Sequence, residues 1–492
     1  MGRGIAQLLA QAGRPVVLYD QSVEAATSAI DAIEARWATM VARDRLSDSA
    51  RQDCVARLSA AQALEGLAGC DLVIEAVVED LAVKRTLFAA LEQRLVPSAV
   101  IASNTSSLSI TALAQGLSRP GRFAGLHFFN PAPLMRLVEV VPGLRTEARV
   151  CDALVDFVRT LGHEPVRARD TPGFIVNHAG RGYLTEALRI VEEGVADFGT
   201  VDRVLRDQLG FRLGPFELMD LTGLDVTHPV MVSLHQQFFG EPRLRPSVIT
   251  AQRLAGGVLG RKTGNGFYRY EDGEAVRRPE AAVPSVAALP PVWVSPHARR
   301  RDELLALLAR LGASVESGEV ASERALCLVA PLGWDVTGTA LSERLDPVRT
   351  VGIDWLLPDA QMRRRVLATT PATGPAWRDA AHALLARDDR PVSMIRDSAG
   401  FIAQRVLATI VNIGADICQQ GICSPTDLDL AVQLGLGYPD GPLTLGDRCG
   451  AVAILEILRN MQTVGGDPRY RPSPWLRRRA ELGLSLLHPD PA

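Results

Sequence analysis

The chain has 492 residues, more than one hydrophobic core usually supports, so several domains are expected. Its 47% hydrophobic and 22% charged residues are typical of a globular protein and exclude a disordered or fibrous chain. The net charge of −3 gives no general attraction to nucleic acid or to an anionic membrane surface, and no apolar run reaches the roughly 18 residues of a membrane span. We therefore expect neither nucleic acid nor membrane as a partner.

The usage of cysteine and lysine is also informative. Seven cysteines with no C-x-x-C pair favour reduced thiols in a cytoplasmic protein over disulfides or zinc, so no metal is expected. Of the 53 basic residues only Lys84 and Lys262 are lysine. Because a compact ammonium and a planar guanidinium are not interchangeable, these two positions are candidates for a specific role, with chance survival as the alternative.

Short apolar runs alternate with helical patterns over the first 130 residues. After an opening helix at Gly2, strands are expected at 16–20, 71–77, 98–103 and 122–129, and helices at 23–45, 80–95 and about 109–117. This alternation predicts a doubly wound, parallel α/β sheet, and we assign residues 1–170 to a Rossmann-like domain that binds a dinucleotide.

Long helical patterns follow, at about 174–194, 200–209, 215–238 and 246–256, and predict an all-α domain over residues 171–275. Residues 271–291 are rich in Pro, Glu and Arg and are typical of a linker. Apolar runs at 292–294, 325–330 and 350–354 then predict a second, degenerate α/β domain over residues 276–395.

The last part of the chain repeats an earlier part with a shift of 227 residues and no gap. Asp170-Thr-Pro-Gly-Phe-Ile-Val-Asn177 aligns with Asp397-Ser-Ala-Gly-Phe-Ile-Ala-Gln404, and 214–220 aligns with 441–447. The period far exceeds that of solenoid repeats, so residues 396–492 are predicted to be a second copy of the helical domain.

The N-terminus has half of a dinucleotide-binding pattern. A helix opens at Gly2, which matches the last glycine of G-x-G-x-x-G, and a strand ends at Asp20, where an acid bonds the ribose 2′-hydroxyl. The first strand and the first two glycines of the pattern are missing from this chain. By itself the pattern leaves a solvated surface acid as an equal interpretation of Asp20.

Four further motifs follow in order: Asn104-Thr-Ser-Ser-Leu, Gly125-Leu-His-Phe-Phe-Asn-Pro131, Leu137-Val-Glu-Val140 and Gly173-Phe-Ile-Val-Asn177. With them the chain resembles the 3-hydroxyacyl-CoA dehydrogenase family, from Met1 to about Tyr270. The added α/β segment and second helical domain resemble the long form of that family found in bacterial phenylacetate degradation, whose substrate is 3-hydroxyadipyl-CoA.

Oxidation of a secondary alcohol by a nicotinamide needs a base for the hydroxyl proton and polar groups that fix the oxygen. His127 suits the base, since imidazole exchanges protons near neutral pH. The resemblance implies that Glu139 orients His127 and that Ser106 and Asn177 hydrogen-bond the substrate's 3-oxygen. Each residue alone has a structural interpretation, but together they predict a site at the carboxyl ends of the strands, between the first two domains.

The resemblance also implies NAD as the cofactor. It places Glu79 and Lys84 near the nicotinamide-side ribose, Asn130 directly after the catalytic segment, and Lys262 in a closing motif near the nicotinamide. Asp20 favours NAD over NADP because it would repel a 2′-phosphate. Arg43 is a candidate contact to the CoA moiety, with a solvated charged face as the alternative.

The sequence thus predicts an NAD-dependent enzyme that oxidises 3-hydroxyacyl-CoA to 3-oxoacyl-CoA. The expected substrate is 3-hydroxyadipyl-CoA or 3-hydroxybutyryl-CoA, in aromatic (phenylacetate) or fatty-acid catabolism. The rival interpretation is a catalytically impaired NAD/CoA-binding or structural homologue, because the first strand is absent; a gene start upstream of Met1 would explain that absence instead. Gln404 replaces the equivalent of Asn177, so the second repeat is predicted to be structural. A monomer or a homodimer is expected.

Overall fold

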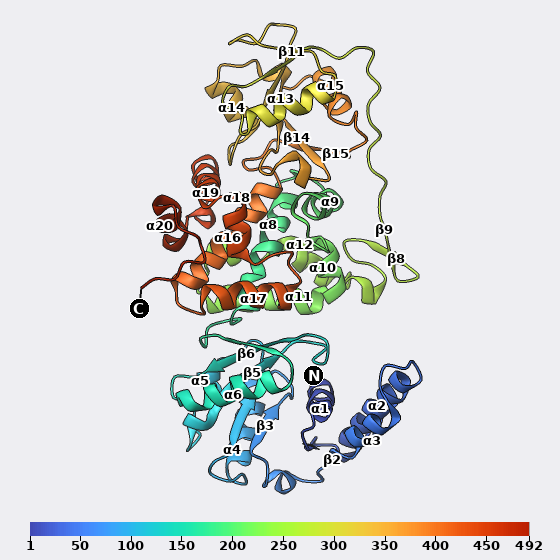
Figure 1. Ribbon diagram of the computed structural model, residues 1–492, viewed down its shortest axis with the longest axis vertical. Coiled ribbons are helices and arrows are strands. Elements are labelled where there is room, and N and C mark those ends of the chain that lie inside the picture. The colour runs from blue at the N-terminus through green and yellow to red at the C-terminus, as the bar shows by residue number, and fades with distance from the viewer. Residues whose placement is uncertain (492) are drawn as a thin grey trace. The chain divides into compact units, whose positions relative to one another are not determined.

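The computed structural model describes residues 1–491 and divides them into two compact units (Figure 1). The first unit contains residues 1–178 together with residues 421–436, and the second contains residues 179–420 and those from 437 onward. The first unit therefore includes the predicted domain of residues 1–170 and also a segment from the predicted domain of residues 396–492. None of the helices in the described part of the chain is long and apolar enough to cross a membrane.

The main sheet of the first unit has five strands in the order β3-β4-β5-β6-β7. Their bounds are β3 Leu72–Glu75, β4 Val100–Ser103, β5 Phe123–Phe128, β6 Leu137–Pro142 and β7 Glu164–Arg167. Neighbours are parallel except β5 and β6, so the expected parallel sheet is wrong at this pair. The connection between them, residues 129–136, is too short for the crossover that a parallel pair needs.

A second, two-stranded parallel sheet pairs β1 (Val16–Leu18) with β2 (Leu58–Ala60), and within the described residues it is not joined to the five-stranded sheet. Around it lie three helices: α1 (Gly2–Gln11), α2 (Val23–Val41) and α3 (Asp48–Val55). The helix expected over 23–45 ends early, at Val41, and Asp44 turns the backbone to φ 53° before the next helix.

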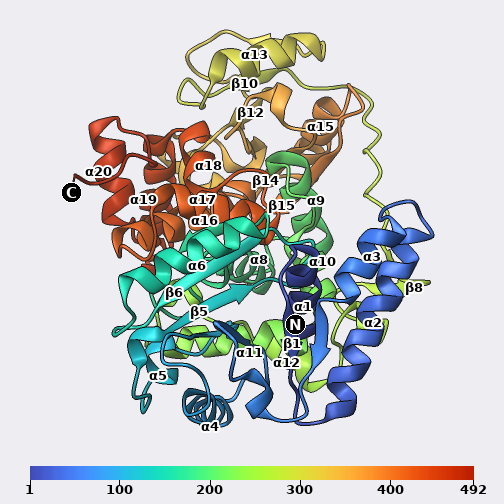
Figure 2. The same cartoon turned by 60° about the horizontal axis from the view of Figure 1, so that its bottom comes forward.

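Helices cover the five-stranded sheet. In α6 (Ala148–Thr160) the apolar residues Val150, Leu154 and Val158 recur every four positions and are buried, and Figure 2 shows this helix lying over β5 and β6. The other α-helices in the N-terminal segment of the first unit are α4 (Leu81–Glu92), α5 (Ile110–Leu113) and α7 (Val176–Ala179). Helix α17 (Pro425–Leu436), from the separate segment, packs against β6 and β7.

The helices of the second unit surround α16 (Ala403–Gln419), which is buried along nearly its whole length. The others are α8 Arg181–Glu192, α9 Phe198–Leu209, α10 Pro215–Thr222, α11 Leu224–Gln237, α12 Val248–Ala255, α18 Pro442–Cys449, α19 Ala451–Gly465 and α20 Pro474–Leu482. The single helix expected at 215–238 is thus two helices, because Gly223 between them has φ 87°. A short hairpin, β8 (Arg269–Glu271) and β9 (Glu274–Val276), begins the predicted linker.

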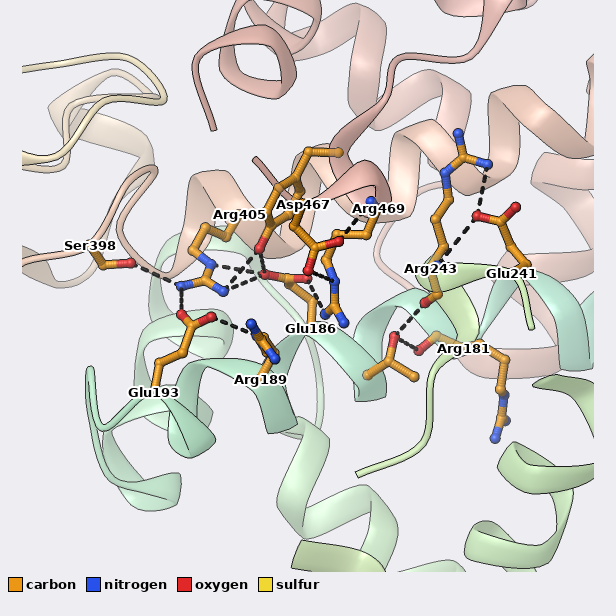
Figure 3. A network of polar contacts seen from close by, with 12 residues as sticks. Arg181, Glu186, Arg189, Glu193, Glu241, Arg243, Ser398, Arg405, Asp467 and Arg469 are labelled. Atoms are coloured by element: carbon orange, nitrogen blue, oxygen red, sulfur yellow. Dashed lines mark hydrogen bonds and ion pairs between the residues drawn. The ribbon is translucent and has the colours of Figure 1, made fainter. Parts of the chain in front are cut away.

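A buried polar network joins the two helical repeats within this unit (Figure 3). Glu186 of α8 forms an ion pair of 2.7 Å with Arg405 of α16 and accepts a hydrogen bond of 2.8 Å from the hydroxyl of Tyr470. Arg405 also pairs with Glu193, at 2.7 Å. Because Glu186 and Arg405 are both almost fully buried, each charge depends on the other for compensation.

The second unit also contains a six-stranded sheet in the order β11-β10-β12-β13-β14-β15, with only β13 and β14 antiparallel. The strands are β10 Val292–Val294, β11 Val315–Glu316, β12 Leu326–Val329, β13 Thr350–Ile353, β14 Arg365–Thr369 and β15 Val392–Arg396. Its helices are α13 Arg301–Arg310, α14 Val336–Ser342 and α15 Pro375–Leu385. The three strands expected from the sequence in this region are confirmed.

Equivalent contacts recur 227 positions apart. In the first unit the Arg169 amide donates to the carbonyl of Ile422 at 2.8 Å, and in the second unit the Arg396 amide donates to Val195 at 3.0 Å. Helix α9 has the same relation to α17: its bounds shifted by 227 are those of α17. Because α17 packs on β6 and the Asp207 carboxylate of α9 pairs with Arg364 beside β14, each repeat places a helix next to the sheet of the other.

Candidate active site

The centre of the predicted site is a histidine paired with a glutamate on neighbouring strands. His127 of β5 lies directly opposite Glu139 of β6 in the antiparallel register, and Nδ1 of His127 is 2.6 Å from Oε2 of Glu139. Both side chains are buried, and Glu139 is not exposed at all. The antiparallel pairing that the sequence analysis missed is therefore what brings these two side chains together.

Backbone amides fix Glu139 from its other side. Its Oε1 accepts hydrogen bonds of 3.0 Å from the amides of Ile175 and Val176, at the start of α7. These bonds leave Oε2 directed at the imidazole, so Glu139 can hold the ring in one orientation and stabilise its cation. The rings of Phe129 and Phe174 lie beside His127, with centroids 4.4 and 6.0 Å from it.

Asn177 and Ser106 lie in contact in the first unit. The side-chain amide of Asn177, the second residue of α7, donates to the backbone carbonyl of Ser106 at 3.5 Å. Ser106 lies in the loop after β4, at the carboxyl edge of the sheet. All four predicted catalytic residues thus belong to the first unit.

Glu79 organises the loop that carries Ser106. Its Oε1 accepts hydrogen bonds from the hydroxyl of Thr105 at 2.6 Å and from the amides of Ser106 and Ser107 at 2.9 and 3.1 Å. Burial raises the pKa of Glu79, but the bond from Thr105 and the charge of Lys84 outweigh it and leave that pKa below its ordinary value. The carboxylate therefore stays ionised while it anchors the loop.

Lys84 is buried, unlike a lysine that offers a free charge to a ligand. Its side chain is 1% exposed, and its ammonium pairs with Glu75 at 2.7 Å and with Glu79 at 3.2 Å. Glu75 in turn accepts a hydrogen bond of 2.6 Å from the hydroxyl of Ser103. Lys84 thus acts on the site through Glu79, and its ammonium is already committed to two carboxylates.

The remaining predicted residues are more exposed. In the first unit Gly2 begins α1, Asp20 follows β1 and accepts a bond from the Ser22 amide, and Asn130 and Arg43 lie on the surface. Arg43 is beyond the end of α2, not on it. In the second unit Lys262 pairs with Asp225 at 2.7 Å.

The sequence analysis missed three supporting residues. They are Glu75, which balances Lys84; Asn104, whose side-chain oxygen accepts from the Phe128 amide at 2.8 Å; and Asp170, which accepts from the amides of Ile110 and Thr111 at 2.8 and 2.7 Å. Glu75 left a signal, since it is an acid at the end of an apolar run. Asn104 and Asp170 are within quoted motifs but their bonds join segments far apart in the sequence.

In the second repeat the corresponding positions hold different residues: Gly333, Asp354, Val366 and Gln404. The side chain of Gln404 donates to Asp354 at 2.9 Å and accepts from the Gly333 amide at 2.8 Å. Asp354 has no carboxylate opposite it, because Val366 occupies the position that corresponds to Glu139. The backbone amide of Asp354 donates to the carbonyl of Val366. No histidine–carboxylate pair exists at this point, which supports a structural role for the second repeat.

A doubly wound sheet with a buried base at its carboxyl edge defines a class of protein, the dinucleotide-dependent dehydrogenases. The residues present fit a dinucleotide: α1 has no side-chain cap, so its first amides are available to phosphate, and Asp20 is exposed for a ribose hydroxyl. A β-carbon at Gly2 would lie 3.8 Å from Cβ of Ala76, an ordinary van der Waals contact.

Comparisons with known proteins extend this class assignment. Residues 1–171 match the NAD-binding domain of 3-hydroxyacyl-CoA dehydrogenase, and residues 173–270 and 400–485 each match the C-terminal domain of that family. The chain is 38% identical to 3-hydroxyadipyl-CoA dehydrogenase of Escherichia coli K12, over 98% of this chain and 96% of the relative. It is 41% identical to the mitochondrial hydroxyacyl-coenzyme A dehydrogenase of Sus scrofa, over 55% of this chain and 88% of the relative.

A solved structure, that of 3-hydroxybutyryl-CoA dehydrogenase from Escherichia coli K12, matches with a TM-score of 0.85 and 37% identity and covers 98% of this chain and 96% of its own. The chain belongs to the 3-hydroxyacyl-CoA dehydrogenase family. It is accordingly an oxidoreductase that uses NAD, and the helical domain of the family occurs in it twice.

Proposed function

We propose that the chain oxidises the 3-hydroxyl of an acyl-CoA to the 3-oxo group with His127 as the general base. One observation carries this proposal: Nδ1 of His127 faces Glu139 at 2.6 Å, and Glu139 is itself held by two backbone amides. This arrangement leaves Nε2 of His127 as the nitrogen that can receive the hydroxyl proton. Glu139 then stabilises the imidazolium that results.

Other residues position the reactants in this proposal. Ser106 and Asn177, which are joined by a hydrogen bond, orient the substrate oxygen toward His127. Glu79 fixes the loop of Ser106, and Lys84 keeps Glu79 ionised. Gly2, Asp20 and Asn130 would hold NAD, which when bound accepts the hydride from C3.

We infer that the preferred substrate is 3-hydroxyadipyl-CoA and that the enzyme serves phenylacetate catabolism. The support is that the relative named for this substrate aligns with both repeats of the chain, whereas the mitochondrial relative aligns with about half of it. 3-Hydroxybutyryl-CoA is the second candidate, because the full-length structural match bears that substrate's name. Arg43 and Lys262 remain proposed contacts to CoA and cofactor, and the cytoplasmic location remains a prediction.

The reverse reaction gives the direct test. NADH oxidation by the full chain is followed with 3-oxoadipyl-CoA and with acetoacetyl-CoA, and the kcat/KM values are compared; NADPH replaces NADH in a parallel series. We expect turnover with both substrates, a higher kcat/KM for the dicarboxylic one, and little activity with NADPH. A preference for acetoacetyl-CoA would overturn the substrate assignment, and no turnover of either, with the chain folded, would favour the impaired homologue.

A further inference from the structure

The second unit has a cavity of about 520 Å³ that the dehydrogenase reaction does not use. Its lining comes from the segments that follow β10 and β12, from α14 and from α19: His297, Arg299, Ala330, Pro331, Trp334 and Glu343 among others. These two strands are neighbours, yet the chain leaves β10 through α13 to reach β11 on the opposite side. The cavity thus lies where connections diverge from the carboxyl ends of the strands, which is where open α/β sheets bind ligands.

A basic group in this cavity has no anionic partner. The backbone amide of Arg299 donates to the carbonyl of Ala330 at 3.3 Å, which ties the two loops together. The Nε of Arg299 is buried and has no hydrogen-bond partner within residues 1–491. Burial and the charge of Arg300 lower the pKa of Arg299, against the influence of Glu456. Because Nε is closed to solvent, an anion in the cavity would be met by the other guanidinium nitrogens of Arg299, which form no ion pair in the described residues.

Two carboxylates face the same space. Glu343 is held in place by the hydroxyl of Ser295, which donates to it at 2.6 Å. Glu456 of α19 is exposed and forms no ion pair in the described part of the chain. Two acids beside one arginine would repel a bare phosphate, so a fitting ligand must offer hydrogen-bond donors as well as an anionic group.

The apolar wall of the cavity further limits the kinds of ligand that fit. Trp334 lines the cavity with 38% of its surface exposed, and Pro331 and Leu332 continue this wall. A planar ring gains stacking energy on an exposed indole. An anion, hydroxyl donors and a flat ring are combined in a nucleotide, and the cavity volume is within the range of small-ligand sites.

We propose that this cavity binds a nucleoside monophosphate, with its phosphate on Arg299, its ribose hydroxyls on Glu343 and Glu456, and its base on Trp334. The turn after β10 reads Ser295-Pro-His-Ala-Arg-Arg and has no glycine. The backbone therefore cannot approach a pyrophosphate as a glycine-rich turn does, which excludes a dinucleotide. The site is separate from the proposed dehydrogenase site and carries no catalytic residue of it.

The test is calorimetric titration of the full chain with AMP in saturating NADH, which occupies the cofactor site of the first unit. We expect one AMP per chain, and at least ~10-fold weaker binding by Arg299→Gln, the scale of a lost charge-assisted bond. The matched control is Arg300→Gln, since Arg300 pairs with Glu303 and does not line the cavity. Both variants should retain the turnover of acetoacetyl-CoA.

Each remaining outcome contradicts the proposal. Absence of AMP binding, or equal affinity of the wild type and Arg299→Gln, would remove the site. Inorganic phosphate that binds as tightly as AMP would indicate a plain anion site, and adenosine that binds as tightly would exclude a role for Arg299. Loss of acetoacetyl-CoA turnover in Arg299→Gln would show that the cavity is linked to the dehydrogenase instead of being separate.

Discussion

A β-carbon added to Gly435 would lie only 2.9 Å from Cγ2 of Val176. The same atom would be 3.0 Å from Cδ2 of Leu137. Val176 donates its amide to Glu139 and is followed by Asn177, and Leu137 begins the strand that carries Glu139. Helix α17 thus packs against the residues that fix the histidine's partner, at a point where an added β-carbon would force the Val176 and Leu137 side chains to shift.

We therefore expect Gly435→Ala to lower kcat by roughly 10-fold, because overpacking at this contact displaces the start of α7 and β6. Steady-state kinetics checks this. Gly465→Ala is the matched control, since a β-carbon at the end of α19 would meet no atom within 4 Å. Equal kcat in the two variants would show that the close approach of α17 has no effect on the site.

Replacing the proposed base should nearly abolish turnover. His127→Gln keeps a polar side chain of similar size but cannot accept the proton, so we expect kcat to fall by at least ~100-fold, the usual scale of a lost general base. His488→Gln, at an exposed histidine, is the control. Circular dichroism verifies the fold, and a folded His127→Gln variant with near-normal turnover would remove His127 from this role.

The two lysines allow a paired test of burial. Lys84→Met leaves the carboxylate of Glu75 buried and uncompensated, which should lower the free energy of unfolding by about 3–5 kcal/mol. Lys262→Met breaks an exposed pair with Asp225 and should cost far less. Chemical denaturation measures both. Similar losses in the two variants would mean that the Lys84 pair is not the stabilising contact described.

Asp354 should make stability depend on pH. Burial raises its pKa to about 6 from the ordinary 3.8. Because the folded state favours the neutral acid, Asp354 contributes about 3 kcal/mol to the free energy of unfolding below about pH 4. This stabilisation is lost as pH rises through 6. Asp354→Asn removes the titration and keeps an oxygen for Gln404.

The melting temperature of Asp354→Asn relative to the wild type should therefore be higher at pH 8 than at pH 5. Asp202, whose pKa burial raises to about 7, has the same sign but is unchanged in both proteins, so it cancels in the difference. A difference in melting temperature that is the same at both pH values would contradict the neutral state of Asp354.

Local patterns were enough to predict most elements. Short apolar runs indicated β3, β4 and β5, whereas the helical spacing of Val150, Leu154 and Val158 in α6 was not used in the prediction. Strand direction was not predictable in the same way. The reversal between β5 and β6 depends on the length of one connection, and the break at Gly223 depends on one φ angle.

The site was predictable as far as its motifs reached. The family resemblance named His127 and Glu139, and the structure places Nδ1 of His127 2.6 Å from the Glu139 carboxylate. The buried environment of Lys84 was not apparent, because a lysine in a helical pattern usually faces solvent, and its partner Glu75 precedes it on another element. Nor could any periodicity show that residues 421–436 belong with the first unit, since that contact spans most of the chain.

Helix α17 also sets the order in which the protein can be completed during translation. Chains are synthesised at about 5–20 residues per second, so residues 421–436 follow His178 out of the ribosome roughly 10–50 s later. Until then the apolar surface of β6 and β7 that α17 covers stays bare on the nascent chain. The first unit therefore cannot complete its folding until residues 421–436 have been synthesised, although most of its residues are made first.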